Sequence, residues 1–123
     1  MAVPGAAAAF TAFNRLNVNP VDAATFEVVG KGATNGAEYW CAAGDFADRT
    51  LRAGWTDRIY IARGRGPSET TGRRSAVQFT LSPEAAGIVP AEPSLRLNAL
   101  EVGDNMSVQA AKGYCQVLPS RRF

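Results

Sequence analysis

Residues 35–53, NGAEYWCAAGDFADRTLRA, carry the clearest local pattern in the chain, and this pattern predicts an amphipathic helix. Asn35 and Glu38 have the spacing of a capping box, in which the Asn side chain accepts a backbone N–H and the Glu side chain reaches back. Gly54 stands where a left-handed residue would end the helix. The apolar side chains that recur at helical spacing are Tyr39, Ala43, Phe46, Ala47 and Leu51. We expect a helix at 36–53 whose apolar stripe lies on a sheet.

The residues on both sides of this helix predict β-strands. Residues 10–18, with a bulge, and 25–29 predict an antiparallel pair joined by a turn. Residues 58–63 and 75–81 are the strongest strand predictions, because both are rich in β-branched or aromatic residues, and they predict a hairpin. Weaker patterns predict further strands at 100–105, 106–110 and 114–118.

The fold class that these elements predict is α+β, with one amphipathic helix packed on a five- to seven-stranded antiparallel sheet. A small β-barrel or sandwich carrying the same helix is the alternative. Residues 10–123 have the size of one ordinary domain, and we expect a single globular domain there. Residues 1–9, MAVPGAAAA, predict the remnant of a secretory signal peptide, because a Pro-Gly pair precedes small residues of the kind that signal peptidase requires. A disordered N-terminus is the other interpretation of this segment.

Cys41 and Cys115 are the only two cysteines. In an exported chain, two cysteines most simply form one disulfide, which here would join the start of the predicted helix to the last predicted strand. Two buried free thiols are the alternative. Because the chain has no histidine and no C-x-x-C, we expect no metal site and no cofactor. The predicted location is periplasmic or secreted.

The charge and hydropathy of the chain exclude several classes of partner. Thirteen basic and eleven acidic residues give a net charge of +2, which is too small for attraction of nucleic acid to the whole surface. No apolar run approaches the ~20 residues that span a bilayer. We therefore expect no specific nucleic-acid partner and no membrane span, and any electrostatic recognition must be local. The protein would be a monomer or a subunit of an envelope complex.

Catalytic residues are not evident in the sequence. The absence of histidine excludes the Ser-His-Asp and Cys-His classes of catalysis. Two carboxylate pairs, Asp45 with Asp48 and Asp57 with Glu38, would support the alternative function of a carboxylate-dependent hydrolase that acts on a cell-envelope glycan. On an amphipathic helix, however, Asp45 and Asp48 are expected to face solvent. We therefore assign no catalytic residue and expect no enzyme activity.

The aromatic residues around the predicted helix admit two interpretations. Tyr39, Trp40, Trp55 and Tyr60 lie close to the helix and to the strand that follows it. They could form the floor of a ligand site, but large aromatic residues near a disulfide usually belong to the core. We expect these four side chains to be part of the core.

The arginines of the predicted hairpin loop are the best candidate contact surface. Four of them form the predicted binding site: Arg63, Arg65, Arg73 and Arg74. The loop at 64–74 contains Gly64, Gly66 and Gly72, whose backbone N–H groups could approach an anion beside these guanidinium groups. The sequence therefore favours a non-catalytic binding or accessory module that contacts a protein or an anionic ligand through this loop. Arginines of this kind also keep edge strands soluble, and the sequence leaves that interpretation open.

Two segments, 39–45 (YWCAAGD) and 71–79 (TGRRSAVQF), resemble small exported proteins of alphaproteobacteria that carry no assigned activity. The resemblance extends over most of the chain after residue 9, and none of its motifs has a known role. It implies a bacterial origin and a periplasmic location. It supplies neither an activity nor site residues.

Overall fold

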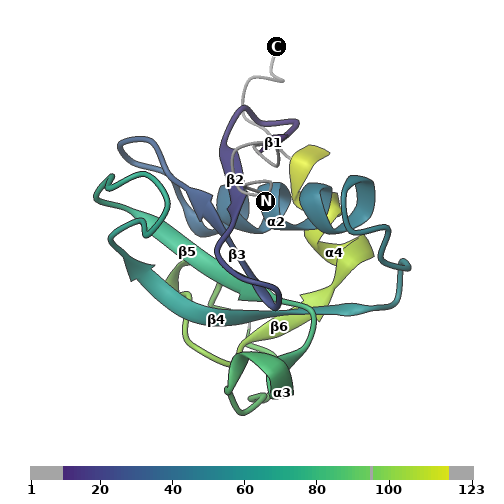
Figure 1. Cartoon of the computed structure of the whole chain (residues 1–123). Coiled ribbons are helices and arrows are strands. Elements are labelled where there is room, and N and C mark those ends of the chain that lie inside the picture. The colour runs from purple at the N-terminus through teal and green to yellow at the C-terminus, as the bar shows by residue number, and fades with distance from the viewer. Residues whose placement is uncertain (1–9, 95, 117–123) are drawn as a thin grey trace, which may run out of the picture.

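A six-stranded antiparallel sheet with one long helix across one face forms the protein (Figure 1), so the predicted α+β class is confirmed. The computed structural model describes residues 10–94 and 96–116, and residues 1–9, with their predicted signal remnant, lie outside this range. The strand order is β1-β2-β3-β5-β4-β6. The strands are β1 (Phe10–Thr11), β2 (Asn17–Pro20), β3 (Thr25–Val29), β4 (Arg58–Gly66), β5 (Ala76–Thr80) and β6 (Asn105–Ser107). The helices are α2 (Gly36–Arg49), α3 (Pro83–Ala86) and α4 (Val108–Gly113), with 3-10 turns η1 (Leu97–Ala99) and η2 (Tyr114–Gln116).

Helix α2 begins as the sequence predicts and ends four residues early. The capping box is present, because Asn35 Oδ1 accepts the Glu38 N–H at 2.9 Å and Glu38 Oε1 accepts the Asn35 N–H at 2.8 Å. The last helical residue is Arg49. Arg52, with a φ of 58°, takes the left-handed conformation that the sequence assigned to Gly54.

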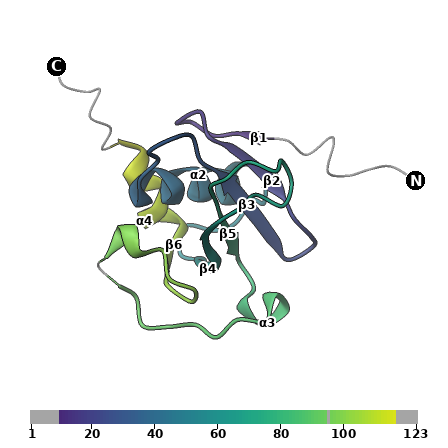
Figure 2. The same ribbon diagram turned by 90° about the vertical axis from the view of Figure 1, so that its left-hand side faces the viewer.

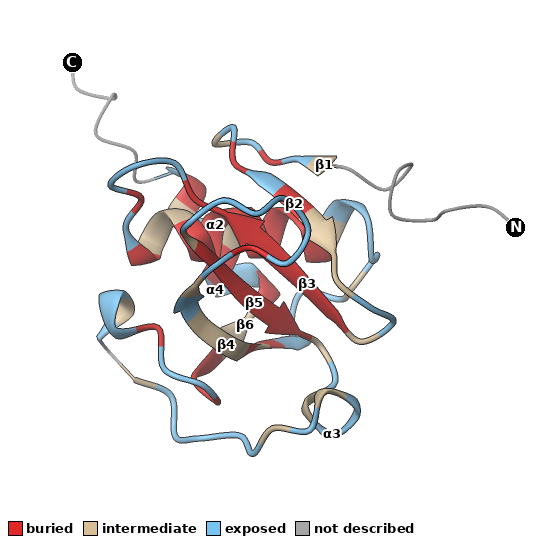
Figure 3. Ribbon diagram, turned by 60° about the vertical axis from the view of Figure 1, so that its left-hand side comes forward, coloured by how far each residue is buried: buried red, intermediate tan, exposed pale blue. Residues whose placement is uncertain are grey.

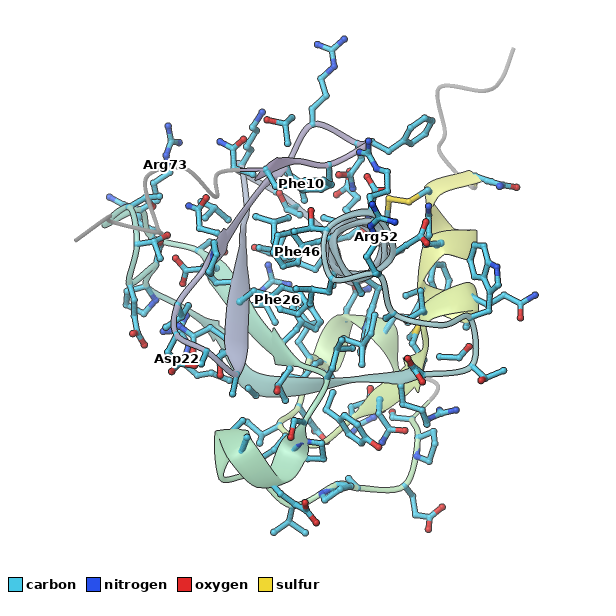
Figure 4. The ribbon with its side chains drawn as sticks, turned by 45° about the vertical axis from the view of Figure 1, so that its right-hand side comes forward. Phe10, Asp22, Phe26, Phe46, Arg52 and Arg73 are labelled. Atoms are coloured by element: carbon cyan, nitrogen blue, oxygen red, sulfur yellow. A yellow bond between two sulfur atoms is a disulfide. The ribbon has the colours of Figure 1, made fainter. Side chains whose placement is uncertain are left out.

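The core lies between α2 and the inner face of the sheet. β3 and β5 are buried along their whole length and form the centre of the sheet (Figure 3). Phe46 of α2 packs between Phe10 and Phe26, with ring centroids 5.3 and 4.7 Å apart, and Figure 4 shows the three rings between the strands and the end-on helix. These aromatic contacts fix the helix on the sheet, because large buried rings dominate core energetics.

The first predicted strand is two short strands. Residues 12–16 form a tight turn between β1 and β2, in which the Arg15 N–H donates to the Ala12 carbonyl and Arg15 has a φ of 73°. The predicted bulge at 10–18 is therefore wrong. The pairing of the first segment with 25–29 is confirmed, since Val18 lies opposite Val28 in the β2–β3 ladder.

The C-terminal part differs most from the prediction, because residues 108–113 form a helix instead of strands. Ser107 caps α4 by accepting the Ala110 N–H at 3.0 Å, and the alanines that follow favour a helix. Only Asn105–Ser107 of the predicted strands 100–105 and 106–110 is extended. The predicted strand at 114–118 is the 3-10 turn η2 as far as residue 116, and its last two residues lie outside the described range.

The disulfide between Cys41 and Cys115 is confirmed, but its surroundings differ from the prediction. Cys41 lies within α2, and Cys115 lies in η2 rather than in a strand. One turn along α2 from Cys41, Gly44 lets α2 and α4 approach closely, because a Cβ at Gly44 would lie 2.8 Å from Ala111 Cβ and 2.9 Å from Lys112 N. The disulfide and this glycine together hold α4 and η2 against α2.

Helix α3 and the connection to η1 complete the described chain. Figure 2 shows α3 at the far side of the molecule from α2, followed by a long connection that returns to η1. The Asn98 side chain after this connection accepts the Gly36 N–H at 2.7 Å, so the connection is anchored at the start of α2. Within 10–94 and 96–116, no helix is long and apolar enough to cross a membrane.

Reduction of the disulfide is expected to lower the free energy of unfolding by about 4 kcal/mol, because the bond closes a loop of 74 residues in the unfolded chain. Urea denaturation with and without reductant measures the loss, and intact mass should rise by about two daltons on reduction. Alkylation of both sulfurs without prior reduction would contradict the pairing.

Replacing Gly44 by Ala is expected to destabilise the fold by about 1–3 kcal/mol through overpacking against α4, although alanine is the better helix former. Gly113→Ala is the matched control, because a Cβ there meets no atom within 4 Å. Chemical denaturation compares the two variants. Equal stability of both would show that α2 and α4 do not pack as closely as described.

Candidate binding site at the β4–β5 loop

A row of polar side chains crosses four strands on the sheet face away from α2. Asn19 of β2 lies opposite Glu27 of β3, Glu27 lies opposite Gln78 of β5, and Gln78 lies opposite Arg63 of β4. Strand alternation puts Glu27 on this outer face, since its neighbour Phe26 enters the core. A register shift after Ile61 places Arg63 opposite Gln78 in the same row.

The Glu27 carboxylate is fully buried and is the acceptor around which the β4–β5 loop folds. Its Oε2 accepts from the Ser68 hydroxyl at 2.6 Å, from the Thr70 N–H at 2.9 Å and from the Thr70 hydroxyl. Its Oε1 accepts from the Glu69 N–H at 3.1 Å and from Gln78 Nε2 at 3.3 Å. Such a set of donors compensates for burial of the charge.

Two opposing effects act on the pKa of Glu27. Burial raises the pKa, whereas the hydrogen bonds from the Ser68 and Thr70 side chains and from the Thr70 and Glu69 backbone lower it. The hydrogen bonds win, and the pKa lies below its ordinary value of 4.5. Glu27 is therefore ionised at neutral pH and holds the loop as a buried anion.

The loop itself is shorter and less open than the sequence predicted. Gly64 and Gly66 belong to β4, so the loop spans 67–75 rather than 64–74. The Gly72 N–H donates to the Ser68 carbonyl at 3.2 Å, and the Ser68 N–H donates to the Arg73 carbonyl at 2.8 Å. The N–H of Gly72, expected to be available to a ligand, is thus used inside the loop, and the Glu69 and Thr70 N–H groups point to Glu27.

Two of the four predicted site arginines are held by the protein itself. Arg63 forms an ion pair with Glu69 at 3.9 Å and also donates to the Ala76 carbonyl. Arg65 Nη1 donates to the Thr34 carbonyl at 3.1 Å, and the Arg65 guanidinium carbon lies 5.1 Å from the centroid of the Tyr39 ring. Both side chains act as internal contacts of the sheet and the helix.

Arg73 and Arg74 are exposed, and neither side chain has a hydrogen bond or an ion pair to the described residues. Both line a hollow of about 500 Å³ together with Gly30, Gly32 and Ser75. Figure 4 shows the Arg73 side chain pointing away from the core. The structure therefore brings Arg73 and Arg74 together at this hollow and gives Arg63 and Arg65 other partners.

Sequence reasoning missed Glu27, the residue that organises this region. The signal was present in TFEVV at 25–29, where a single carboxylate interrupts an apolar strand. A buried charge needs donors, and Ser68-Glu69-Thr70 supplies them from a segment about forty positions away. The sequence does not indicate which donors face which strand.

The candidate catalytic carboxylates on α2 form ion pairs. Asp45, expected to face solvent, is buried, and that expectation is wrong. Arg49 binds both of its oxygens at 2.8 Å, and the Phe13 N–H donates to it at 2.8 Å. Burial alone would raise the pKa of Asp45. These hydrogen bonds and the charges of Arg49 and Lys112 lower the pKa by more, so it lies below its ordinary value. Asp48 accepts a hydrogen bond from Lys112 Nζ at 2.7 Å.

The second carboxylate pair, Glu38 and Asp57, is separated by the length of α2. Glu38 lies in the first turn of α2, where it completes the capping box. Asp57 lies in the loop after the helix and accepts the Gly54 N–H at 2.8 Å. Both carboxylates thus have structural partners.

Comparison with protein-family models, curated protein sequences and solved structures gives no match for this chain. Among residues 10–94 and 96–116, no three His, Cys, Asp or Glu side chains are grouped so that they could hold a metal ion.

Replacing Glu27 by Gln is expected to lower the free energy of unfolding by roughly 2–3 kcal/mol at pH 7. The Gln side chain would place its own NH2 group, a donor, against the hydroxyl and N–H groups that donate to the carboxylate. The loss should disappear at acidic pH. Since the folded pKa of Glu27 is lowered, its contribution is fully present above about pH 4.5 and is lost as the pH falls through the folded pKa.

Urea denaturation between pH 3 and pH 7 measures this difference. Glu92→Gln is the matched control, because Glu92 is exposed and has no hydrogen bond or ion pair to the described residues. An E27Q variant as stable as E92Q at pH 7, or a difference that does not shrink in acid, would show that the carboxylate does not hold the loop.

Proposed function

We propose that the protein is a non-catalytic binding module that contacts an anionic partner through Arg73 and Arg74. The observation that supports this proposal most strongly is the pair of free guanidinium groups beside the Gly30–Gly32 hollow. Guanidinium groups bind carboxylate, sulfate and phosphate oxygens in a bidentate manner, and here no described carboxylate occupies them.

The neighbouring acidic side chains do not compete for these arginines. Glu27 is buried and accepts hydrogen bonds from the loop, and Glu69 accepts from Gln78 and pairs with Arg63. The hollow at Arg73 and Arg74 therefore keeps an unbalanced positive charge. Such a local field attracts an anion even though the net charge of the whole chain is only +2.

The backbone of this site is ordered before any ligand arrives. Ser68 connects Glu27 to Arg73, because its hydroxyl donates to the Glu27 carboxylate and its N–H donates to the Arg73 carbonyl. Ser75, on the other side of the arginine pair, accepts the Gly30 N–H at 2.7 Å through its carbonyl. Preorganisation of this kind reduces the entropy lost on binding.

We place this module in the periplasm or outside the cell. The disulfide supports that location, because disulfides persist in oxidising compartments. An acidic surface of another envelope protein is a partner of the required charge.

A carboxylate-dependent hydrolase is less consistent with the geometry. A general acid needs a raised pKa, whereas Asp45 is held by Arg49 and its pKa is lowered. Asp48 is likewise bound to Lys112.

Sulfate at millimolar concentration is expected to raise the melting temperature, because it binds the folded state alone, and the shift should shrink as sodium chloride is added. Differential scanning fluorimetry measures both effects. The double variant Arg73→Gln/Arg74→Gln should lose the shift and keep the melting temperature of the unliganded protein, since exposed arginines contribute little to folding.

The matched control is Arg15→Gln/Arg96→Gln, which removes two exposed positive charges elsewhere on the chain. This control should retain the sulfate shift. A shift that survives the loss of Arg73 and Arg74, or that ignores salt, would place the anion elsewhere.

A further inference from the structure

A second pocket, of about 530 Å³, opens beside the disulfide between the β1–β2 turn and helices α2 and α4. Its rim carries two exposed aromatic side chains, Phe13 at 67% and Trp55 at 54% exposure, although Trp55 was expected in the core. We call this the Trp55 pocket. Its other lining residues are Asp45, Arg49, Gln109, Lys112, Cys115 and Gln116.

Close packing of the two helices builds this pocket. Gly44 lets α4 approach α2, which brings the Lys112 ammonium to 2.7 Å from Asp48 Oδ2 and 3.5 Å from Asp45 Oδ1. Lys112 Nζ also lies 5.9 Å from the centroid of the Trp55 ring. The Trp55 carbonyl accepts the Gln109 N–H at 3.1 Å, which fixes the loop that carries the indole.

The charged side chains of the Trp55 pocket are all ion-paired. Arg49 and Asp45 line the pocket and pair with each other, and Lys112 pairs with Asp45 and with Asp48, which lies outside the lining. A charged ligand would therefore find no unpaired charge of the opposite sign among these side chains. The pocket favours a neutral ligand that has an apolar face for the indole and a polar edge for the charged and amide side chains.

The backbone at the rim does not suit an extended peptide. Peptides that add to an exposed strand edge bind through free main-chain groups. Here the Phe13 N–H donates to Asp45 and the Gln109 N–H donates to the Trp55 carbonyl. The pocket offers side-chain groups instead: Arg49 and Lys112 donate hydrogen bonds, and the Gln109 amide both donates and accepts them.

We propose that the Trp55 pocket binds a neutral hexopyranose unit of a glycan. The C–H face of a pyranose ring is apolar and lies flat on an indole, while its hydroxyl rim donates and accepts hydrogen bonds around the edge. A volume of about 530 Å³ lies within the range of pockets that enclose small organic ligands. The pocket only holds the sugar, since Asp45 and Asp48 are committed to Arg49 and Lys112.

This inference is independent of the anion contact at Arg73 and Arg74. The two sites share no lining residue. The cations of the Trp55 pocket are ion-paired and a hexopyranose is neutral, so salt should weaken sulfate binding and leave sugar binding nearly unchanged.

Titration of the full, oxidised chain with cellohexaose, chitohexaose and maltohexaose tests the proposal, with tryptophan fluorescence and calorimetry as readouts. At least one of these neutral oligosaccharides should bind at millimolar or lower concentration and change the emission of Trp55, because Trp40 is fully buried. Trp55→Ala should weaken binding about ten-fold, the effect of losing a stacked aromatic contact. Trp55→Phe should retain most of the affinity.

Val89→Ala is the matched control, because Val89 is also an exposed apolar side chain and does not line the pocket. It should bind as the unmodified protein does, and all variants should have similar melting temperatures. Failure of all three oligosaccharides to bind would overturn the proposal, as would binding that W55A leaves unchanged. Tighter binding of an aromatic tripeptide than of any sugar would assign the pocket to peptides instead.

Discussion

The buried carboxylate of Glu27 is the constraint on which the β4–β5 loop, on the sheet face away from α2, depends. A charge in the middle of a sheet is costly unless donors surround it, and here two hydroxyls, two backbone N–H groups and one amide do so. The donors come from the β4–β5 loop and from β5, so satisfying the charge requires the loop to fold back over the sheet. The loop thereby covers the polar face that α2 leaves open, and its remaining arginines point outward.

A second constraint organises the opposite side of the molecule. The Cys41–Cys115 bond and the glycine at position 44 hold α4 and η2 on α2, and this contact brings Lys112 to the carboxylates of Asp45 and Asp48. Trp55, fixed through its carbonyl by α4, stays at the surface as a result. The two sides thus present different chemistry, with unpaired arginines at one hollow and an aromatic pocket whose charges are ion-paired at the other.

Local signals in the sequence predict the fold better than the sites. The capping box at Asn35 and the β-branched runs of β3, β4 and β5 act through near neighbours, so the helix start and the central strands were predictable. Residues 107–111 also carry local helix signals, the cap at Ser107 and the alanines that follow it, which the strand prediction did not use. Apart from Arg49, the partners of Glu27 and Asp45 lie about thirty to seventy positions away, and their identity follows only from strand register and helix packing. For the same reason the sequence predicted the arginine loop but could not distinguish Arg63 and Arg65, which have internal partners, from Arg73 and Arg74.

Amide hydrogen exchange at the β4–β5 loop tests most directly whether Glu27 holds this part of the molecule. The Glu69 and Thr70 N–H groups, which donate to Glu27, should be protected at neutral pH although both residues are exposed. The Arg74 N–H, which has no acceptor in the described part of the chain, should exchange rapidly. In the E27Q variant all three should exchange at similar rates. Equal and rapid exchange at all three positions in the unmodified protein would contradict the central role of Glu27.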